Sequence, residues 1–162
     1  MKAAFLPDRG VVKVSGEDAR NFLNGLVTTD VTLLRPGLGR FGALLTPQGK
    51  IIADFIVAEA PAKDGGGFFL DVQRALCATL VAKLNIYKLR AKVIVEDLSA
   101  VLGVLAAWHG SGTTKQGLSY ADPRLPALGL RVMLPPHLAA AAVAELGATL
   151  HAAQLSEFPP RR

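Results

Sequence analysis

The chain changes several times between a period-two pattern of hydrophobic residues and a helical one, and each change marks the end of a short element. The apolar run Val11 to Val14 predicts a strand. From Ala19 to Leu26 the apolar residues recur at i, i+3, i+4 and i+7, the spacing of one buried helix face. Ser15, with Asp18 three residues later, is similar to a capping box, so we expect the helix to begin there.

The middle of the chain predicts a β-hairpin, a third strand and a helix that docks on them. The hairpin covers Leu38 to Ala60, because the turn residues Thr46 to Gly49 separate two apolar runs there. Phe68 to Val72 predicts the third strand. Between Arg74 and Leu84 apolar residues recur at helical spacing, which suits an amphipathic helix on that sheet.

The second half of the chain contains further strand patterns and one helix pattern. The strands are expected at Lys92 to Glu96, Val101 to Trp108 and Leu128 to Leu134, and the helix at Pro136 to Gly147. Helices and mostly antiparallel strands alternate without strict βαβ order, which predicts an α+β fold of antiparallel sheets with flanking helices. We expect residues 1–147 to form the folded part and residues 148–162 an irregular tail.

The composition indicates a folded domain with a mild positive charge. Hydrophobic residues make up 51% of the 162 residues and charged residues 19%, which excludes a disordered chain. The net charge is +5, but Arg161 and Arg162 at the chain end contribute to it, so a nucleic-acid partner is disfavoured. No uncharged apolar stretch reaches the length of about 20 residues that a membrane helix needs. Without a signal-peptide pattern before Asp8, we expect a cytoplasmic protein with no membrane partner.

Two motifs that often mark chemistry have plainer explanations here. Gly37 to Gly42 matches the dinucleotide motif G-x-G-x-x-G, but a hairpin and not a helix follows, so we interpret the glycines as easing a twisted strand. Cys77 is the only cysteine and lies on the apolar face of its predicted helix, which favours a buried, unreactive thiol. A single cysteine, and histidines without ligand spacing, predict no metal site.

Asp54 is the strongest candidate for chemistry, because it interrupts the apolar run Ile51 to Val57. Strand alternation places Ile52, Asp54 and Ile56 on one face. A carboxylate on such a face is paired, hydrated in a cleft or raised in pKa, and the last two arrangements place a base beside an amine substrate. The alternative, an edge-strand aspartate that faces solvent, is equally compatible with the pattern.

A second candidate is the segment Tyr87-Lys88-Leu89-Arg90, which joins an aromatic ring to two cations just before a strand. Such a cluster can hold an anionic ligand through charge-assisted hydrogen bonds. It also fits a solvated helix end, where cations stabilise the last carbonyl groups, and this second interpretation is the commoner arrangement.

The order of several segments resembles the folate-binding YgfZ family, which is related to GcvT, the aminomethyltransferase of the glycine cleavage system. The segments that carry the resemblance are Arg9 to Ala19, Phe22 to Val31, Leu44 to Phe55, Tyr87 to Arg90 and Asp122 to Arg124. In the aminomethyltransferases two adjacent aspartates follow the hairpin turn, whereas Ala53 and Asp54 occupy those positions here.

The resemblance implies a GcvT-like fold that binds tetrahydrofolate and supports the assembly or repair of iron–sulfur enzymes, with links to tRNA modification. Its implied partners are a reduced folate and iron–sulfur client enzymes. The residues expected at the folate are Thr28, Thr29, Asp30, Asp54, Tyr87, Lys88 and Arg90. Of these, Asp54 faces the pterin and is the candidate catalytic residue, while Lys88 or Arg90 meets the glutamate carboxylates.

The chain also departs from the family. YgfZ-like proteins carry a Lys-Gly-Cys motif that this sequence lacks, so we expect a truncation or shifted reading frame after Gly147, and self-association through the surface left exposed. The first alternative function is a folate-dependent aminomethyltransferase of the glycine cleavage type, which Ala53 disfavours. The second is a non-enzymatic basic module that binds RNA or protein.

Overall fold

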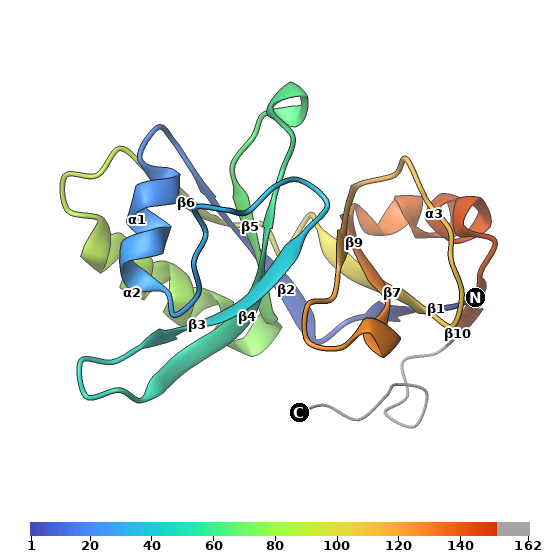
Figure 1. The fold of residues 1–162 in the computed structure, drawn as a ribbon, viewed down its shortest axis with the longest axis horizontal. Helices are drawn as coiled ribbons and strands as arrows, with labels where there is room; N and C mark the ends of the chain where they lie inside the picture. The colour runs from blue at the N-terminus through green and yellow to red at the C-terminus, as the bar shows by residue number, and fades with distance from the viewer. Residues whose placement is uncertain (152–162) are drawn as a thin grey trace.

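Two five-stranded sheets lie side by side and form the body of the protein (Figure 1). The computed structural model describes residues 1–151, and only the backbone of residues 149–151. Sheet 1 has the strand order β10-β1-β7-β9-β8, and sheet 2 has the order β3-β4-β5-β2-β6. The strands of sheet 1 are β1 (Lys2–Leu6), β7 (Gly103–Trp108), β8 (Leu118–Ala121), β9 (Leu130–Leu134) and β10 (Thr149–His151). Those of sheet 2 are β2 (Arg9–Ser15), β3 (Gly39–Leu45), β4 (Ile51–Glu59), β5 (Phe68–Gln73) and β6 (Ile94–Asp97).

Helices cover the outer side of each sheet. Two of them, α1 (Ala19–Leu26) and α2 (Cys77–Lys88), pack on sheet 2, and α3 (Ala139–Leu146) packs on sheet 1 (Figure 1). Short 3-10 turns are η1 (Ala62–Asp64), η2 (Arg74–Leu76), η3 (Pro126–Leu128) and η4 (Pro136–Leu138). Within the described residues the strand pairs are antiparallel except β1 with β10, so the predicted α+β class is confirmed. None of the helices described is long and apolar enough to cross a membrane.

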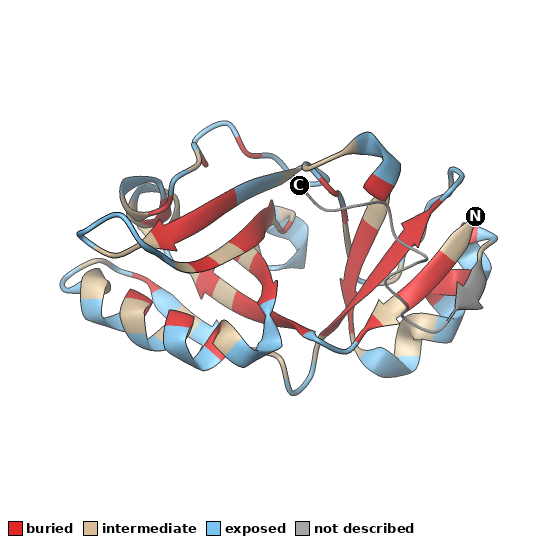
Figure 2. Ribbon diagram, turned by 90° about the horizontal axis from the view of Figure 1, so that it is seen from below, coloured by how far each residue is buried: buried red, intermediate tan, exposed pale blue. Residues whose placement is uncertain are grey.

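Sheet 2 is covered on both faces, because its strands alternate between two apolar clusters. Ala53, Phe55 and Val57 of β4 pack against α1 and α2 on the side that we call the helix face. Ile56 and Ala58 point the other way, onto the side that we call the inner face, and pack against sheet 1. Figure 2 shows buried residues along the strands of both sheets. The molecule is therefore layered as helix, sheet, sheet, helix.

A β-bulge in the predicted hairpin changes one expectation about these faces. The register of β3 and β4 shifts between Leu44 and Leu45, and Ile52 has no opposite residue on β3. Ile52 therefore packs with the helix-face cluster and does not share the side of Asp54. Alternation predicts the face of Asp54 and Ile56 correctly and that of Ile52 wrongly, because a bulge interrupts the period of two.

Three strands were not expected from the sequence, namely β1, β8 and β10. Each is short; β1 and β10 are completed by strands from distant parts of the chain, and β8 pairs with β9, the next strand along the chain. Thr149–His151 pairs in parallel with β1, so regular structure continues into the segment predicted to be an irregular tail. The rest of that segment, residues 152–162, lies outside the described residues.

The first helix begins at Ala19, later than the capping-box pattern at Ser15 predicts, because Ser15 is the last residue of β2. Asp18 is the N-cap residue and makes no capping hydrogen bond with its side chain. Its carboxylate instead accepts a hydrogen bond of 2.8 Å from the backbone N–H of Lys92. Asp18 therefore ties the start of α1 to the segment that leads into β6.

Replacing Phe55 tests how much the helix-face core contributes to the stability of the fold. It is fully buried, and Phe55→Ala should lower the free energy of unfolding by about 3–5 kcal/mol, because it removes a large apolar side chain and leaves a cavity. The control is Phe41→Ala on neighbouring β3, where the side chain is 44% exposed and the loss should be much smaller. Urea denaturation followed by circular dichroism measures both. Equal losses would show that the helix face is not the main core.

Candidate functional site

Asp54 lies on the inner face of sheet 2, in the half of β4 nearest the hairpin turn. It pairs with Ala43 of β3, and its neighbours along the strand, Ala53 and Phe55, point into the helix-face core. Its side chain is half-buried, and it makes no hydrogen bond or ion pair with any residue that the structure describes. A half-buried carboxylate with open acceptor positions is suited to a ligand that carries N–H donors.

The loop that contains Thr28 adjoins β3, the strand that pairs with β4 at Asp54. The backbone N–H of Thr28 donates to the carbonyl of Ala43 at 3.0 Å, and the Ala43 N–H donates to the Thr28 hydroxyl at 3.0 Å. Val27 forms an isolated bridge to Leu44, so the loop extends the edge of β3. The structure thus brings Thr28 and Asp54 to either side of Ala43.

Thr29 and Asp30 follow in the same loop but are engaged locally. The Thr29 hydroxyl accepts a hydrogen bond of 3.3 Å from Nε of Arg40. The Asp30 carboxylate accepts hydrogen bonds from the hydroxyl and the backbone N–H of Thr32, and these bonds lower the pKa of Asp30. Asp30 therefore stabilises its own turn, which holds Thr28 in place.

Tyr87, Lys88 and Arg90 lie elsewhere, at the end of α2 on the helix face. Tyr87 packs against the helix-face core, Lys88 is half-buried in the last helical turn, and Arg90 is exposed. Asp54 is on the opposite face of sheet 2, so the structure does not bring these residues to it. The helix-end interpretation of the segment therefore fits its position better than a shared ligand site does.

A buried ionic cluster, which sequence reasoning missed, joins the two sheets. Asp71 of β5 is fully buried, and its Oδ1 accepts a hydrogen bond of 2.7 Å from Nε of Arg9 on β2. From sheet 1, Arg131 donates through Nη1 to Oδ2 at 2.7 Å, and the Tyr120 hydroxyl donates to the same oxygen at 2.8 Å. One carboxylate therefore holds groups from β2, β8 and β9 together.

The electrostatics of this cluster keep Asp71 ionised. Burial alone would raise the pKa of its carboxyl, but the positive charges of Arg131 and Arg9 outweigh this effect and hold the pKa below its usual value. Burial, together with the negative charge of Asp71, raises the pKa of Tyr120 well above its usual value. Tyr120 therefore stays a neutral donor.

A second carboxylate extends the cluster toward the surface. Nε of Arg131 lies 3.4 Å from Oδ2 of Asp122, and Arg124 makes two hydrogen bonds to the same carboxylate, of 2.9 and 2.5 Å. This is the Asp122-Pro123-Arg124 segment that contributes to the family resemblance. Its acidic residue is part of the contact between the sheets.

The sequence contained a signal for this cluster. Asp71 interrupts the apolar run Phe68 to Val72 just as Asp54 interrupts its own strand. Its partners lie 62, 49 and 60 positions away along the chain, so no local pattern identifies them. The same pattern therefore marks one paired and one unpaired aspartate, and only the packing of the sheets distinguishes them.

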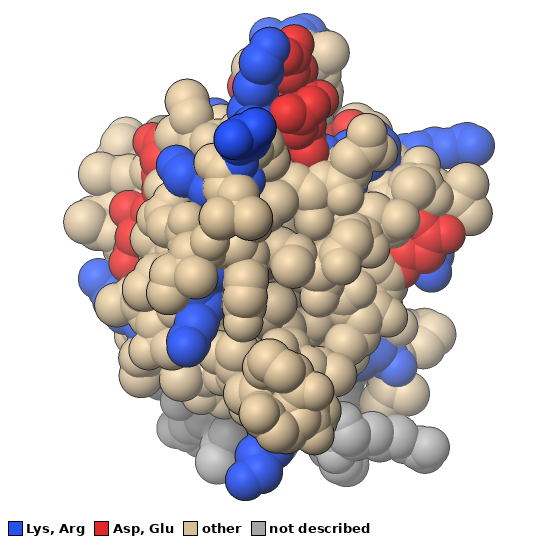
Figure 3. Space-filling view, turned by 90° about the vertical axis from the view of Figure 1, so that its left-hand side faces the viewer, with Lys and Arg blue, Asp and Glu red and all other residues tan. Residues whose placement is uncertain are grey.

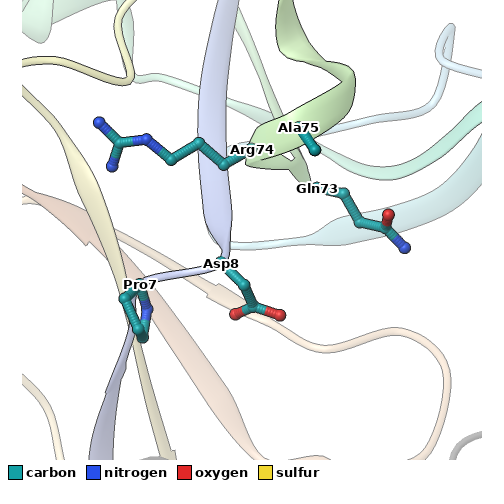
Figure 4. A pocket seen from close by; sticks show the side chains of 5 residues that line it. All are labelled: Pro7, Asp8, Gln73, Arg74 and Ala75. Carbon is teal, nitrogen blue, oxygen red and sulfur yellow. The ribbon is translucent and has the colours of Figure 1, made fainter.

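A surface hollow of about 430 Å³ lies beside the inner face of sheet 2, where the chain passes from β1 to β2 (Figure 4). Its lining comprises Pro7, Asp8, Gln73, Arg74 and Ala75. The Asp8 and Gln73 side chains point to one side and that of Arg74 to the other. Because β5 pairs Val72 with Phe55 of β4, Gln73 is the residue next to Asp54 across the strands.

Cys77 is buried, as predicted, at the start of α2. Burial raises the pKa of its thiol, which accepts a hydrogen bond of 3.4 Å from the Ser99 hydroxyl. Among the side chains that the structure describes, residues 1–148, no group of three or more His, Cys, Asp and Glu is placed to hold a metal ion. The middle of the face at the α1 and α2 end is mostly uncharged, and charges of both signs lie around it (Figure 3).

Comparisons with known proteins agree on the fold and leave the activity of this chain to be proposed. No model of a known protein family matches the sequence. The chain is 36% identical over 146 residues to an "Iron-sulfur cluster assembly factor IBA57 homolog, mitochondrial" of Mycosarcoma maydis, covering 82% of this chain and 36% of that protein. The chain is 32% identical over 138 residues to the homolog of the same name from Pyricularia oryzae, and this match covers 80% of this chain and 35% of that protein. The chain therefore spans about a third of the length of these relatives.

Among solved structures, the glycine cleavage system aminomethyltransferase T from Bartonella henselae has the same fold. The TM-score is 0.73 at 17% identity, and the match covers 96% of this chain and 48% of that one. The predicted GcvT-like fold is thereby confirmed. The narrower assignment to YgfZ and the cytoplasmic location stay predictions; the names of the relatives describe those proteins as mitochondrial.

Replacing Asp71 tests how much the ionic cluster contributes to the stability of the fold. Asp71→Asn leaves Arg9 buried without a counter-charge and Arg131 with only the more distant Asp122, and the free energy of unfolding should fall by about 3–5 kcal/mol at neutral pH. The folded-state pKa of Asp71 is depressed, so its contribution is complete above about pH 4 and is lost as the pH falls through the folded-state value. The difference between wild type and Asp71→Asn should therefore shrink below about pH 4 in denaturation curves.

The control for this experiment is Asp64→Asn, which changes an exposed aspartate in η1 in the same way. Its stability should match that of wild type at every pH. A difference between wild type and Asp71→Asn that stays constant down to about pH 2 would contradict the ionic explanation.

Proposed function

We propose that this chain binds a reduced folate on the inner face of sheet 2 and acts in iron–sulfur cluster assembly. The observation that carries the folate part is Asp54, a half-buried carboxylate with no partner among the described residues. The assembly role rests on relatives named as iron–sulfur cluster assembly factors, which are up to 36% identical to this chain over the aligned segment. The fold shared with the glycine cleavage system aminomethyltransferase T is compatible with the resemblance from which folate binding is expected.

The residues around Asp54 fit tetrahydrofolate in chemistry. A reduced pterin presents several N–H donors, and the Asp54 carboxylate offers acceptor positions that the protein does not use. The Thr28 hydroxyl accepts from the Ala43 N–H and still has its own proton to donate. Bound tetrahydrofolate would supply nitrogen atoms that carry one-carbon groups, while Asp54 and Thr28 orient the ring by a charge-assisted and a neutral hydrogen bond.

At the two positions where the related aminomethyltransferases have adjacent aspartates, this chain has one carboxylate, that of Asp54. Ala53, at the position of the first, points into the helix-face core and is 1% exposed. This supports a protein that binds folate rather than one that cleaves glycine. Lys88 and Arg90 lie on the other side of sheet 2, so we do not include them among the residues that meet the glutamate carboxylates.

Titration with tetrahydrofolate tests the folate site. Asp54→Asn keeps the size of the side chain but removes the charge, and the dissociation constant should rise about tenfold or more, the value of a charge-assisted hydrogen bond. Isothermal titration calorimetry under anaerobic conditions measures this change. The full chain is used, with circular dichroism to show that the variant is folded.

Two matched variants accompany this titration. Asp64→Asn makes the same change at an exposed position in η1, and Lys88→Ala removes a cation on the helix face; both should bind as wild type does. Equal weakening by all three would indicate a general charge effect. Unchanged binding by Asp54→Asn would remove Asp54 from the site.

The assembly role is tested in cells that lack this protein. Their iron–sulfur enzymes should lose activity while the amounts of the polypeptides stay constant, because the apoproteins are made but not loaded. The wild-type gene should restore activity, and the Asp54→Asn gene should restore less. Full activity in the deletion strain would contradict a role in assembly, whereas full rescue by Asp54→Asn would separate that role from folate.

A further inference from the structure

The outer edge of sheet 2 is formed by β6, which pairs with β2 and with no other described strand. The Leu98 N–H donates to the carbonyl of Val11 at 2.8 Å, and the Lys92 carbonyl accepts from the N–H of Asp18 at 3.3 Å. Even-numbered residues of this segment therefore bond toward the β2 side. In an antiparallel ladder the odd-numbered residues, Val93 and Val95 among them, direct their backbone groups outward.

The side chains along this edge leave an apolar centre in solvent. Ile94 is 59% exposed on the surface side, while Val93 and Val95 turn toward the helix-face core. Edge strands in monomeric proteins are usually shortened, covered or given charges that prevent pairing with another chain. Lys92 and Glu96 do flank Ile94, but they carry opposite signs.

This arrangement is complementary to itself. When two copies of Lys92 to Glu96 run antiparallel about an axis at Ile94, the two Ile94 side chains are opposite each other. Val93 then lies opposite Val95, and Lys92 lies opposite Glu96, twice by symmetry. In this register Val93 and Val95 form the hydrogen-bonded pairs, and these are the residues whose backbone groups point outward. Side chains, charges and backbone therefore all fit one register.

We propose that β6 pairs with β6 of a second copy of this chain in this register, which joins the two copies of sheet 2 into one continuous sheet. Within one copy, Nζ of Lys92 lies 2.9 Å from Oε1 of Glu17, but both side chains are largely exposed. Such a surface ion pair is weak, so Lys92 can exchange Glu17 for Glu96 of the second copy. Glu96 has no ion pair within the described part of the chain and is available to the partner copy. A strand pair of this length is small, so we expect a weak dimer that forms at high concentration.

Sedimentation equilibrium of the full chain up to about 1 mM measures the association. Ile94→Lys places two like charges opposite each other on the axis and should weaken dimerisation about tenfold or more. The matched control is Val101→Lys, the same kind of change at a position that is also 59% exposed but lies outside β6. It should dimerise as wild type does.

A charge exchange tests the register. Lys92→Glu and Glu96→Lys each place like charges opposite each other in a homodimer, so each alone should stay monomeric at concentrations where wild type dimerises. Mixed together they restore both opposite pairs, and the double variant Lys92→Glu/Glu96→Lys restores them within one chain; both should dimerise. Circular dichroism confirms that each variant is folded.

Two outcomes overturn the proposal. One is a wild-type chain that stays monomeric over the whole concentration range. The other is association that Val101→Lys weakens as much as Ile94→Lys does, or that the mixture of the two charge variants fails to restore, because the contact then lies elsewhere on the surface.

Discussion

The contact between the Asp71 carboxylate and the guanidinium groups of Arg9 and Arg131 is the interaction on which the arrangement of the two sheets depends. Apolar side chains also fill the space between the sheets, but apolar contact has no direction and allows them to slide. The ionic cluster does have direction, because Oδ1 of Asp71 accepts from Arg9 of sheet 2, and Oδ2 accepts from Arg131 and Tyr120 of sheet 1. Burial makes a displacement expensive, since any uncompensated charge would lie away from water.

This contact also divides the inner face of sheet 2 into two parts with different properties. Around Asp71 the face is covered by sheet 1, and the carboxylate accepts from Arg9, Arg131 and Tyr120. Around Asp54 the face is only partly covered, and the carboxylate has no partner among the described residues. A carboxylate that the fold neutralises serves structure, whereas one that the fold leaves open is available to a ligand. This contrast, and not the mere presence of an aspartate in an apolar strand, supports the folate proposal.

Several of the exposed apolar residues lie along the margins of sheet 2. Leu38, Phe41 and Ile51 lie in or beside the β3–β4 hairpin, and Ile94 lies in β6 at the opposite edge. One face of this sheet is covered by helices and the other, apart from the part around Asp54, by sheet 1, so the edges offer further capacity for contacts. The edge that we propose for contact with a second copy is the one at β6.

The sequence by itself determined most of the local structure, including α1, the β3–β4 hairpin, β5 and the buried Cys77, because periodicity and turn residues act over a few positions. It also identified Asp54 as a polar residue in an apolar strand. The tertiary structure alone decided three things: that Asp71 is paired, that Tyr87, Lys88 and Arg90 are on the opposite face from Asp54, and that β1 and β10 are strands. Each depends on partners far away along the chain, and a local pattern contains no information about which distant segments meet.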